Sequence, residues 1–136
     1  MWPFKSKLDE FGRSDLHYAA RDGDSSLSDR LIRKGLDVNL ADENGWTPLH
    51  FAAQAQAPEV VALLLDAGAQ VDPKDVHGNT PLFKAVFGSK GRGDTIKLLR
   101  ARGADALSVN KHGQTPVGLA RLIGNYDVKQ YFEDLP

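Results

Sequence analysis

Apolar residues recur at helical spacing in four segments of the chain. Within a segment they lie about three or four positions apart or next to each other, which places them on one side of a helix. These residues are Leu27, Leu31 and Ile32, then Val60, Val61, Leu64 and Leu65, then Ile96 and Leu99, and finally Val128, Tyr131 and Phe132. One apolar stripe per helix predicts a core that forms by stacking the helices side by side.

A further helix is predicted upstream of each of these segments, because a capping signal lies there. Thr47, Thr80 and Thr115 are suitable N-caps, and each is followed by a proline, which favours the first helical position. The predicted helices begin at Asp15, Pro48, Pro81 and Pro116, and the one from Pro48 extends to about Ala55. Glycines at positions 35, 68 and 103 follow the apolar segments and predict left-handed residues that end those helices.

The capping signals belong to a repeat. The sequence Gly-Trp-Thr-Pro-Leu-His at residues 45–50 recurs in altered form at residues 78–83 and 113–118, with a degenerate copy at residues 12–17. Its Ser or Thr falls at positions 14, 47, 80 and 115, in steps of 33, 33 and 35 residues. A second sequence, Gly-Leu-Asp-Val-Asn at residues 35–39, recurs at 68–72 and 103–107 in steps of 33 and 35. The two extra residues fall within residues 88–94.

This period and these two sequences resemble ankyrin repeats. The resemblance runs from about Asp9 to the C-terminus and implies an all-α solenoid of helix-turn-helix units with projecting β-turn or hairpin loops. We expect a single domain over residues 9–136, with repeats at about 9–41, 42–74, 75–109 and 110–136, after an N-terminal extension at 1–8. The first unit should act as a cap, with a second helix whose outside is polar at Ser25, Ser26, Ser28, Asp29 and Arg30.

Composition narrows the range of functions. The 136 residues suit one domain, and 41% hydrophobic residues are enough to build a core. The 17 Lys and Arg nearly balance the 18 Asp and Glu, so we expect no nucleic-acid partner. Cysteine is absent, and the longest apolar run, Val60 to Leu65, is too short for a membrane span. With no signal-peptide pattern in the first residues, the sequence predicts a cytoplasmic protein without membrane contact.

Chemistry at the histidines and glycines is not expected. The four histidines form repeat-equivalent pairs, and equivalent residues of packed helices should lie about 8–10 Å apart, too far to share a metal ion. The resemblance implies that His17 and His50 bond backbone groups between units, whereas His77 and His112 precede turn glycines. Residues 88–93 are rich in glycine but lack the phosphate-loop spacing. We therefore expect no cofactor, no metal and no enzymatic activity.

The resemblance places a partner on the concave face, which is built from the turns and the exposed side of each first helix. The predicted partner-binding residues are Arg13, Arg21, Glu43, Asn44, Trp46, His77, Asn79, Phe87, His112 and Gln114, with Glu10, Phe11, Asp22, Gln54 and Lys111 nearby. Trp46 is singled out because its equivalents are polar and because tryptophan often anchors interfaces. The alternative is that Trp46 only covers a neighbouring turn.

The predicted function is binding of one protein partner by a chain that is a monomer when free. Blocking or neutralising that partner is the simplest mechanism for a small binding domain. Compact bacterial members of the resembled family include immunity proteins that neutralise toxins. The alternative is an adaptor or structural subunit of a larger complex, which should show a second exposed apolar patch.

Overall fold

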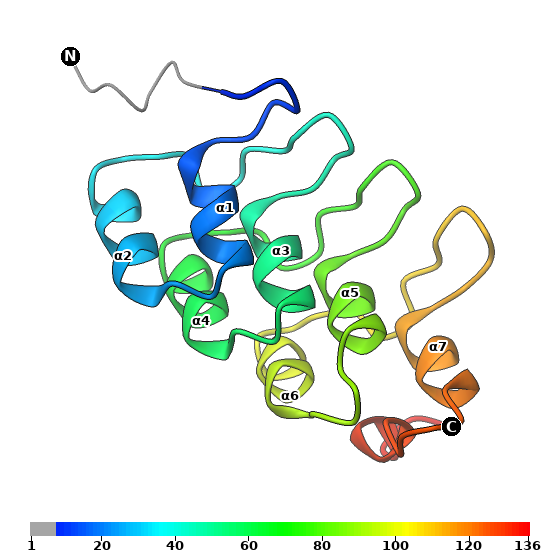
Figure 1. Cartoon of the computed structure of the whole chain (residues 1–136). Helices are drawn as coiled ribbons and strands as arrows, with labels where there is room; N and C mark the ends of the chain where they lie inside the picture. The colour runs from blue at the N-terminus through cyan, green and yellow to red at the C-terminus, as the bar shows by residue number, and fades with distance from the viewer. Residues whose placement is uncertain (1–7) are drawn as a thin grey trace.

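The structure is a computed structural model that describes residues 8–136. Its elements are α1 (Asp15–Arg21), α2 (Ser25–Arg33), α3 (Pro48–Gln54), α4 (Pro58–Asp66), α5 (Pro81–Phe87), α6 (Asp94–Ala101), α7 (Pro116–Leu122) and the 3-10 helix η1 (Lys129–Phe132). Figure 1 shows two rows of helices: α1, α3, α5 and α7 lie in one row, and α2, α4 and α6 lie in the other. The loops between successive pairs project from one side. Residues 8–136 thus form the predicted all-α helix-turn-helix solenoid.

The first helices begin where the capping signals predict. The hydroxyl oxygen of Thr47 accepts a hydrogen bond from the backbone N–H of His50 at 3.4 Å, and Thr80 and Thr115 cap α5 and α7 in the same way. At the C-terminal ends of the second helices, the glycines after α2, α4 and α6 have φ angles of 94°, 97° and 93°. Such left-handed residues satisfy the last carbonyl groups of a helix. Both predicted helix boundaries are confirmed.

Each projecting loop is a hairpin that one acidic or amide side chain stabilises. Asp42 Oδ1 accepts the backbone N–H groups of Asn44 and Trp46, both at 2.9 Å. Asp9, Asp75 and Asn110 make the equivalent bonds in the other loops. Neighbouring loops are joined by one backbone hydrogen bond each, such as that from Glu43 N–H to Phe11 O at 2.9 Å. The loops therefore form a continuous row.

The core lies between the two rows of helices. The first helices contribute Leu16, Leu49, Leu82 and Val117, and the second helices contribute Leu31, Val60, Val61, Leu64, Ile96 and Leu99, all of them buried. Leu27, Ile32 and Leu65 are partly buried against this cluster. The apolar stripes that the sequence predicts thus face the core, as stacking of the units requires.

Two details of the predicted helices are wrong. Ser28 does not lie on the polar outside of α2; it is buried, and its hydroxyl oxygen has no hydrogen-bond partner. The last segment is the short 3-10 helix η1, and not an α-helix, although its Val128 and Phe132 are buried as expected. The Tyr131 carbonyl accepts a hydrogen bond from Arg100 at 2.8 Å. The N–H of Leu135, which an α-helix would pair with that carbonyl, bonds to Phe132 O instead. The apolar spacing was right because one tight turn also brings both side chains to the core.

The two inserted residues lengthen the link between α5 and α6, as the sequence predicts. This link runs through residues 88–93, whereas three residues separate α3 from α4. The link packs against the C-terminal segment: the Tyr131 hydroxyl donates a hydrogen bond to Gly91 O at 2.8 Å. At Gly93 an added Cβ would overlap the Tyr131 ring. The insertion therefore serves as a dock for η1.

Candidate partner-binding surface

Two first helices, α1 and α3, are each joined to the next loop by one buried histidine. His50 Nδ1 accepts the backbone N–H of Thr47 at 3.1 Å, and its Nε2 donates to Asn79 O at 2.9 Å. His17 makes the same pair of bonds, with Nε2 at 3.1 Å from Trp46 O. Burial lowers the pKa of both imidazoles, so the neutral ring is the form that fits. These histidines are structural, as the resemblance implies.

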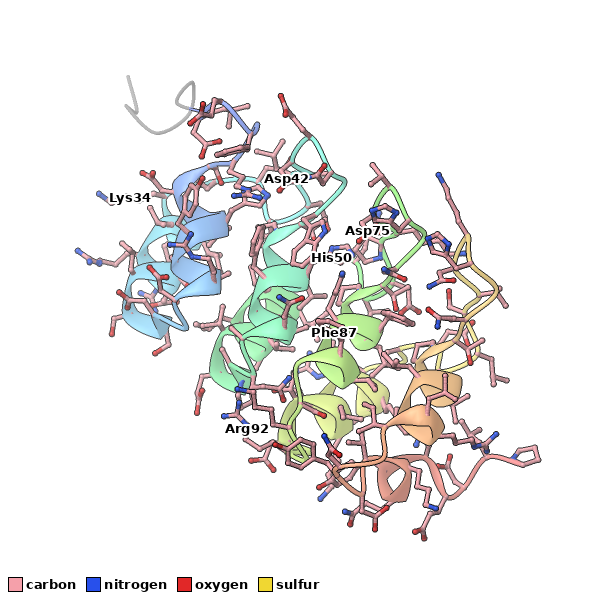
Figure 2. All side chains as sticks on the ribbon, turned by 45° about the vertical axis from the view of Figure 1, so that its right-hand side comes forward. Lys34, Asp42, His50, Asp75, Phe87 and Arg92 are labelled. Carbon is pink, nitrogen blue, oxygen red and sulfur yellow. The ribbon has the colours of Figure 1, made fainter. Side chains whose placement is uncertain are left out.

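The exposed sides of the first helices carry two rows of side chains, one residue of each per unit. The upper row consists of Tyr18, Phe51, Lys84 and Leu119, all partly buried, and the lower row consists of Arg21, Gln54, Phe87 and Leu122, all exposed. We call these two rows, together with the loops above them, the concave face. Figure 2 shows Asp42 and Asp75 in neighbouring loops and Phe87 on α5 below them. The repeat places chemically different residues at equivalent positions of one surface.

A cavity of about 290 Å³ lies on this face between α1 and α3. It is lined by Arg21, Trp46, Phe51, Gln54 and Ala55. The Trp46 ring is partly buried, with its centroid 4.8 Å from that of Phe51 and 5.7 Å from that of His50. Trp46 therefore packs on the first helix of its own unit and still borders an open cavity. Three residues predicted from the sequence, Arg21, Trp46 and Gln54, come together here.

Lys84 connects this cavity to Phe87. Its Nζ lies 4.5 Å from the centre of the Trp46 ring and 5.9 Å from that of Phe87, and it is 4.0 Å from Asp75 Oδ2. Phe87 itself is 66% exposed. Lys84 is not among the residues predicted from the sequence, although a signal exists: the equivalent residues Tyr18, Phe51 and Leu119 are apolar or aromatic. A lone cation at an otherwise apolar repeat position is unusual.

Two predicted site residues take part in stacking instead. Arg13 Nε forms an ion pair with buried Asp42 at 2.9 Å, and this hydrogen bond raises the pKa of Arg13. Asn79 is only 8% exposed, and its Oδ1 accepts a bond from Asn110 Nδ2 at 2.8 Å. The expectation that these two positions are not needed for stacking is wrong, because the side chains of Arg13 and Asn79 each bond to the next loop.

The other predicted residues lie at the loop tips. Glu43, Asn44, His77, His112 and Gln114 are exposed there, as are Glu10, Phe11 and Lys111 nearby. The rings of His77 and His112 are 5.9 Å apart, closer than the expected helix spacing, because Lys111 N–H bonds to His77 O and draws the loops together. Within residues 8–136, no group of three or more metal-ligating side chains is found.

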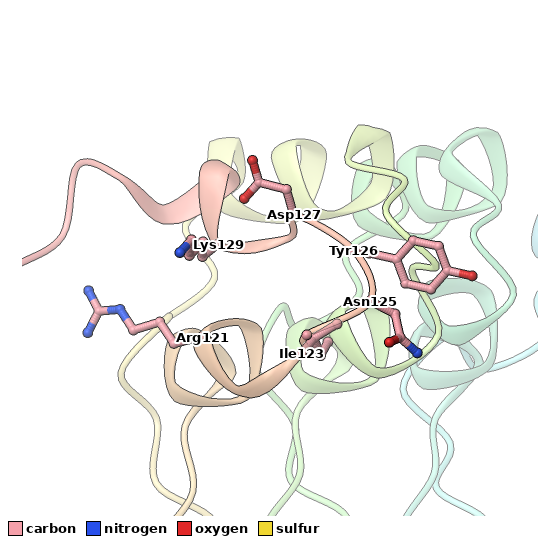
Figure 3. A pocket seen from close by; sticks show the side chains of 7 residues that line it. Arg121, Ile123, Asn125, Tyr126, Asp127 and Lys129 are labelled. Atoms are coloured by element: carbon pink, nitrogen blue, oxygen red, sulfur yellow. The ribbon is translucent and has the colours of Figure 1, made fainter.

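Two further pockets lie near the C-terminal end of the solenoid. One, of about 320 Å³, lies between Phe87 and Tyr126. The other, of about 500 Å³, has Arg121 and Lys129 on one side and Tyr126 on the other (Figure 3). The Arg121 guanidinium donates to the carbonyl groups of Leu135 and Pro136, so this cation is already engaged. Exposed Leu122 and Tyr126 extend the apolar part of the face and were not predicted.

Comparisons with known proteins agree with this geometry. A family model described as ankyrin repeats, in three copies, matches residues 16–110. No curated protein matches the chain. None of the helices within residues 8–136 is long and apolar enough to span a membrane, and the cytoplasmic location and the division into four units stay predictions. Ankyrin repeats are protein–protein interaction modules that typically have no enzymatic activity. The chain belongs to the ankyrin repeat family.

Proposed function

We propose that the chain binds one protein partner through its concave face and thereby blocks a surface of that partner. The observation that carries this proposal is the cavity beside Trp46, which combines an aromatic wall with the polar groups of Arg21 and Gln54. Concave sites with a few placed polar groups are where proteins most often bind their ligands. Phe87 extends the same surface with an exposed aromatic ring.

The hydrogen bonds of the loop that carries Trp46 use its backbone and not its ring. Trp46 contributes to the fold through its backbone, since its N–H donates to Asp42 and its C=O accepts from His17. Asn79 and Gln114 occupy the equivalent positions without an indole ring. A large aromatic residue that the loop does not require is a candidate interface anchor.

An immunity protein that neutralises a toxin is the specific form of this function that we propose. A small binding domain neutralises an enzyme by covering its active surface. The second candidate is an adaptor in a larger complex, and one observation favours it. Leu107 and Val109, in the segment leading to the last loop, are 58% and 54% exposed and form a second apolar site. A partner bound there as well as on the concave face would indicate an adaptor.

The test begins by isolating the partner with the immobilised chain and identifying it by mass spectrometry. Calorimetric titration then compares the wild type with Trp46→Ala, which should bind about 2 kcal/mol more weakly with a nearly unchanged melting temperature. Glu59→Ala on α4 is the control from the opposite row of helices, and Asp66→Ala probes the same row; the Asp66 ion pair with Arg102 is exposed, so its loss should change stability little. Arg100 is unsuitable as a control, because it pairs with Asp134 and holds the C-terminal segment.

The concave face is rejected as the site if Trp46→Ala binds normally while Asp66→Ala loses affinity. The blocking mechanism is tested separately by assaying the partner's own activity with and without the chain. A partner that is bound but fully active would favour the adaptor.

A further inference from the structure

Lys84 departs from the repeat pattern in both charge and environment. The other three side chains of the upper row, Tyr18, Phe51 and Leu119, pack against the helices without bringing a charge to the surface. Burial lowers the pKa of Lys84, and the nearby carboxylate of Asp75 opposes this effect. A partly buried cation without a close partner reduces the stability of the fold. Lys84 thus faces the buried Asp75 carboxylate at 4.0 Å, and it also reaches the aromatic rings of the concave face.

Trp46 leaves one buried carboxylate oxygen of Asp75 without a hydrogen-bond partner. In the loop before it, Arg13 pairs with Asp42, and in the loop after it Asn79 bonds to Asn110. Trp46 occupies the equivalent position and makes no such bond, so the buried Oδ2 atom of Asp75 has no hydrogen-bond partner. Lys84 Nζ approaches this atom only to 4.0 Å, beyond hydrogen-bond distance. The ion pair is long, and the lysine keeps its donors free.

Among the cations on the first helices, Lys84 lies nearest the aromatic rings of this surface. Arg21 Nε is 3.2 Å from Asp22 Oδ1, and Arg121 donates to the last carbonyl groups of the chain. Within residues 8–136, no hydrogen bond of Lys84 Nζ is found; the ammonium group lies instead over the Trp46 ring, with Phe87 on its own helix. An ammonium group near two aromatic rings, whose ion pair with Asp75 is as long as 4.0 Å, can donate hydrogen bonds to a further carboxylate in a partly desolvated setting, where such a pair is stronger than on an open surface.

We infer that the segment bound on the concave face presents an Asp or Glu carboxylate to Lys84, with apolar side chains on either side that cover Trp46 and Phe87. This inference rests on the proposed function and specifies the chemistry of the partner. The carboxylate supplies the acceptor that Asp75 does not supply within hydrogen-bond distance. The apolar neighbours exclude water from the pair and fill the cavity beside Trp46.

The test uses a random peptide library displayed on phage and selected on the immobilised full chain. Four proteins serve as targets: the wild type, Lys84→Met, Lys84→Glu and the control Lys97→Met. Lys97 is matched to Lys84, since its Nζ lies 5.3 Å from the centre of the Tyr131 ring, but it belongs to α6 in the other row of helices. Lys84→Met keeps the stem that packs on Trp46 and removes only the charge.

Peptides enriched on the wild type and on Lys97→Met should carry an acidic residue beside apolar residues. Lys84→Met should lose the acidic preference, and Lys84→Glu should select Lys or Arg instead. The dissociation constant of a selected acidic peptide should rise about tenfold or more in Lys84→Met. If Lys84→Glu does not fold, as circular dichroism would show, Lys84→Met carries the comparison.

The inference is overturned if the wild type and Lys84→Met enrich the same peptides, or if the wild type enriches none. A Trp46→Ala arm separates this failure from that of the proposed function. Peptides without acidic residues that still need Trp46 would overturn the role of Lys84 and leave the concave face as the binding site. Peptides that need neither residue would overturn both.

Discussion

The residue after a turn glycine decides whether a side-chain bond joins its loop to the next one, in addition to the backbone hydrogen bond. Arg13 forms an ion pair with Asp42, and Asn79 accepts a hydrogen bond from Asn110, so both serve the fold. Trp46 breaks this series and leaves Asp75 with one unpaired oxygen atom. The departure coincides with the cavity and with the long ion pair of Lys84 and Asp75. Function is thus expected where a local rule of the repeat is given up.

The buried histidines make stability depend on pH. His50 Nδ1 must stay unprotonated to accept the N–H of Thr47, and burial lowers the pKa of His50 in the folded state. The unfolded chain, with a histidine pKa near 6.5, therefore binds more protons as the pH falls. The stabilisation is complete above that pKa and is lost below it, by at most about 1.4 kcal/mol per histidine one pH unit below the unfolded pKa.

We expect the free energy of unfolding in urea to fall between about pH 7.5 and about pH 5.5, and to fall less in His50→Gln. His77→Gln makes the same substitution at an exposed loop tip and is the control. An unchanged pH dependence in His50→Gln would contradict the assignment of a buried neutral imidazole.

At the scale of elements, the link between α5 and α6 and the helix η1 form one docked pair. The contact depends on a flat surface at Gly93, against which the Tyr131 ring lies, and on the bond from the Tyr131 hydroxyl to Gly91 O. Arg100 holds the same segment through Asp134 and the Tyr131 carbonyl. The last unit thus closes the solenoid with a single turn of helix.

Gly93→Ala should displace the Tyr131 ring and lower the free energy of unfolding by about 1–3 kcal/mol, the usual cost of overpacking. Amide hydrogen exchange of residues 128–135 should become faster than in the wild type. Gly124→Ala is the matched control, since nothing lies within 4 Å of an added Cβ there. Equal exchange rates in the two variants would show that the segment does not depend on this contact.

The whole molecule has two faces with different roles. Stacking of equivalent residues builds the core between the two rows of helices, and each unit contacts only its neighbours, as in other solenoids. The loops and first helices then present one surface, on which Lys84 lies near both Trp46 and Phe87. Figure 2 shows Phe87 on this surface. The second row of helices carries charged pairs such as Arg102 with Asp66.

We expect the free chain to sediment as a monomer of 14.8 kDa. Leu107 and Val109 expose apolar surface, but two side chains fall well short of the roughly 1,200 Å² that a stable interface buries. Sedimentation over a range of concentrations measures the mass. A dimer that reverts to a monomer in Leu107→Lys would contradict the prediction and assign this end of the solenoid to self-association.

The arrangement of helices and loops can be predicted from local signals along the chain, apart from the 3-10 helix η1. Caps at Thr47, Thr80 and Thr115, prolines at the first helical positions and left-handed glycines act within a few residues of the chain, so their effects can be inferred without tertiary contacts. The apolar stripes and the constant period then predict stacking. Trp46 could be chosen as a candidate interface anchor from the sequence, because its comparison with the equivalent residues needs only the register of the repeat.

Only the tertiary structure decided which exposed positions are free to bind. Arg13 and Asn79 are used up by neighbouring loops, whereas Lys84, distant in sequence from Trp46, joins that residue to Phe87. These pairings depend on how closely adjacent loops approach and on which side chains meet across them. The repeat period predicts which equivalent residues lie side by side. It does not predict which of two chemically different neighbours forms a side-chain hydrogen bond or ion pair.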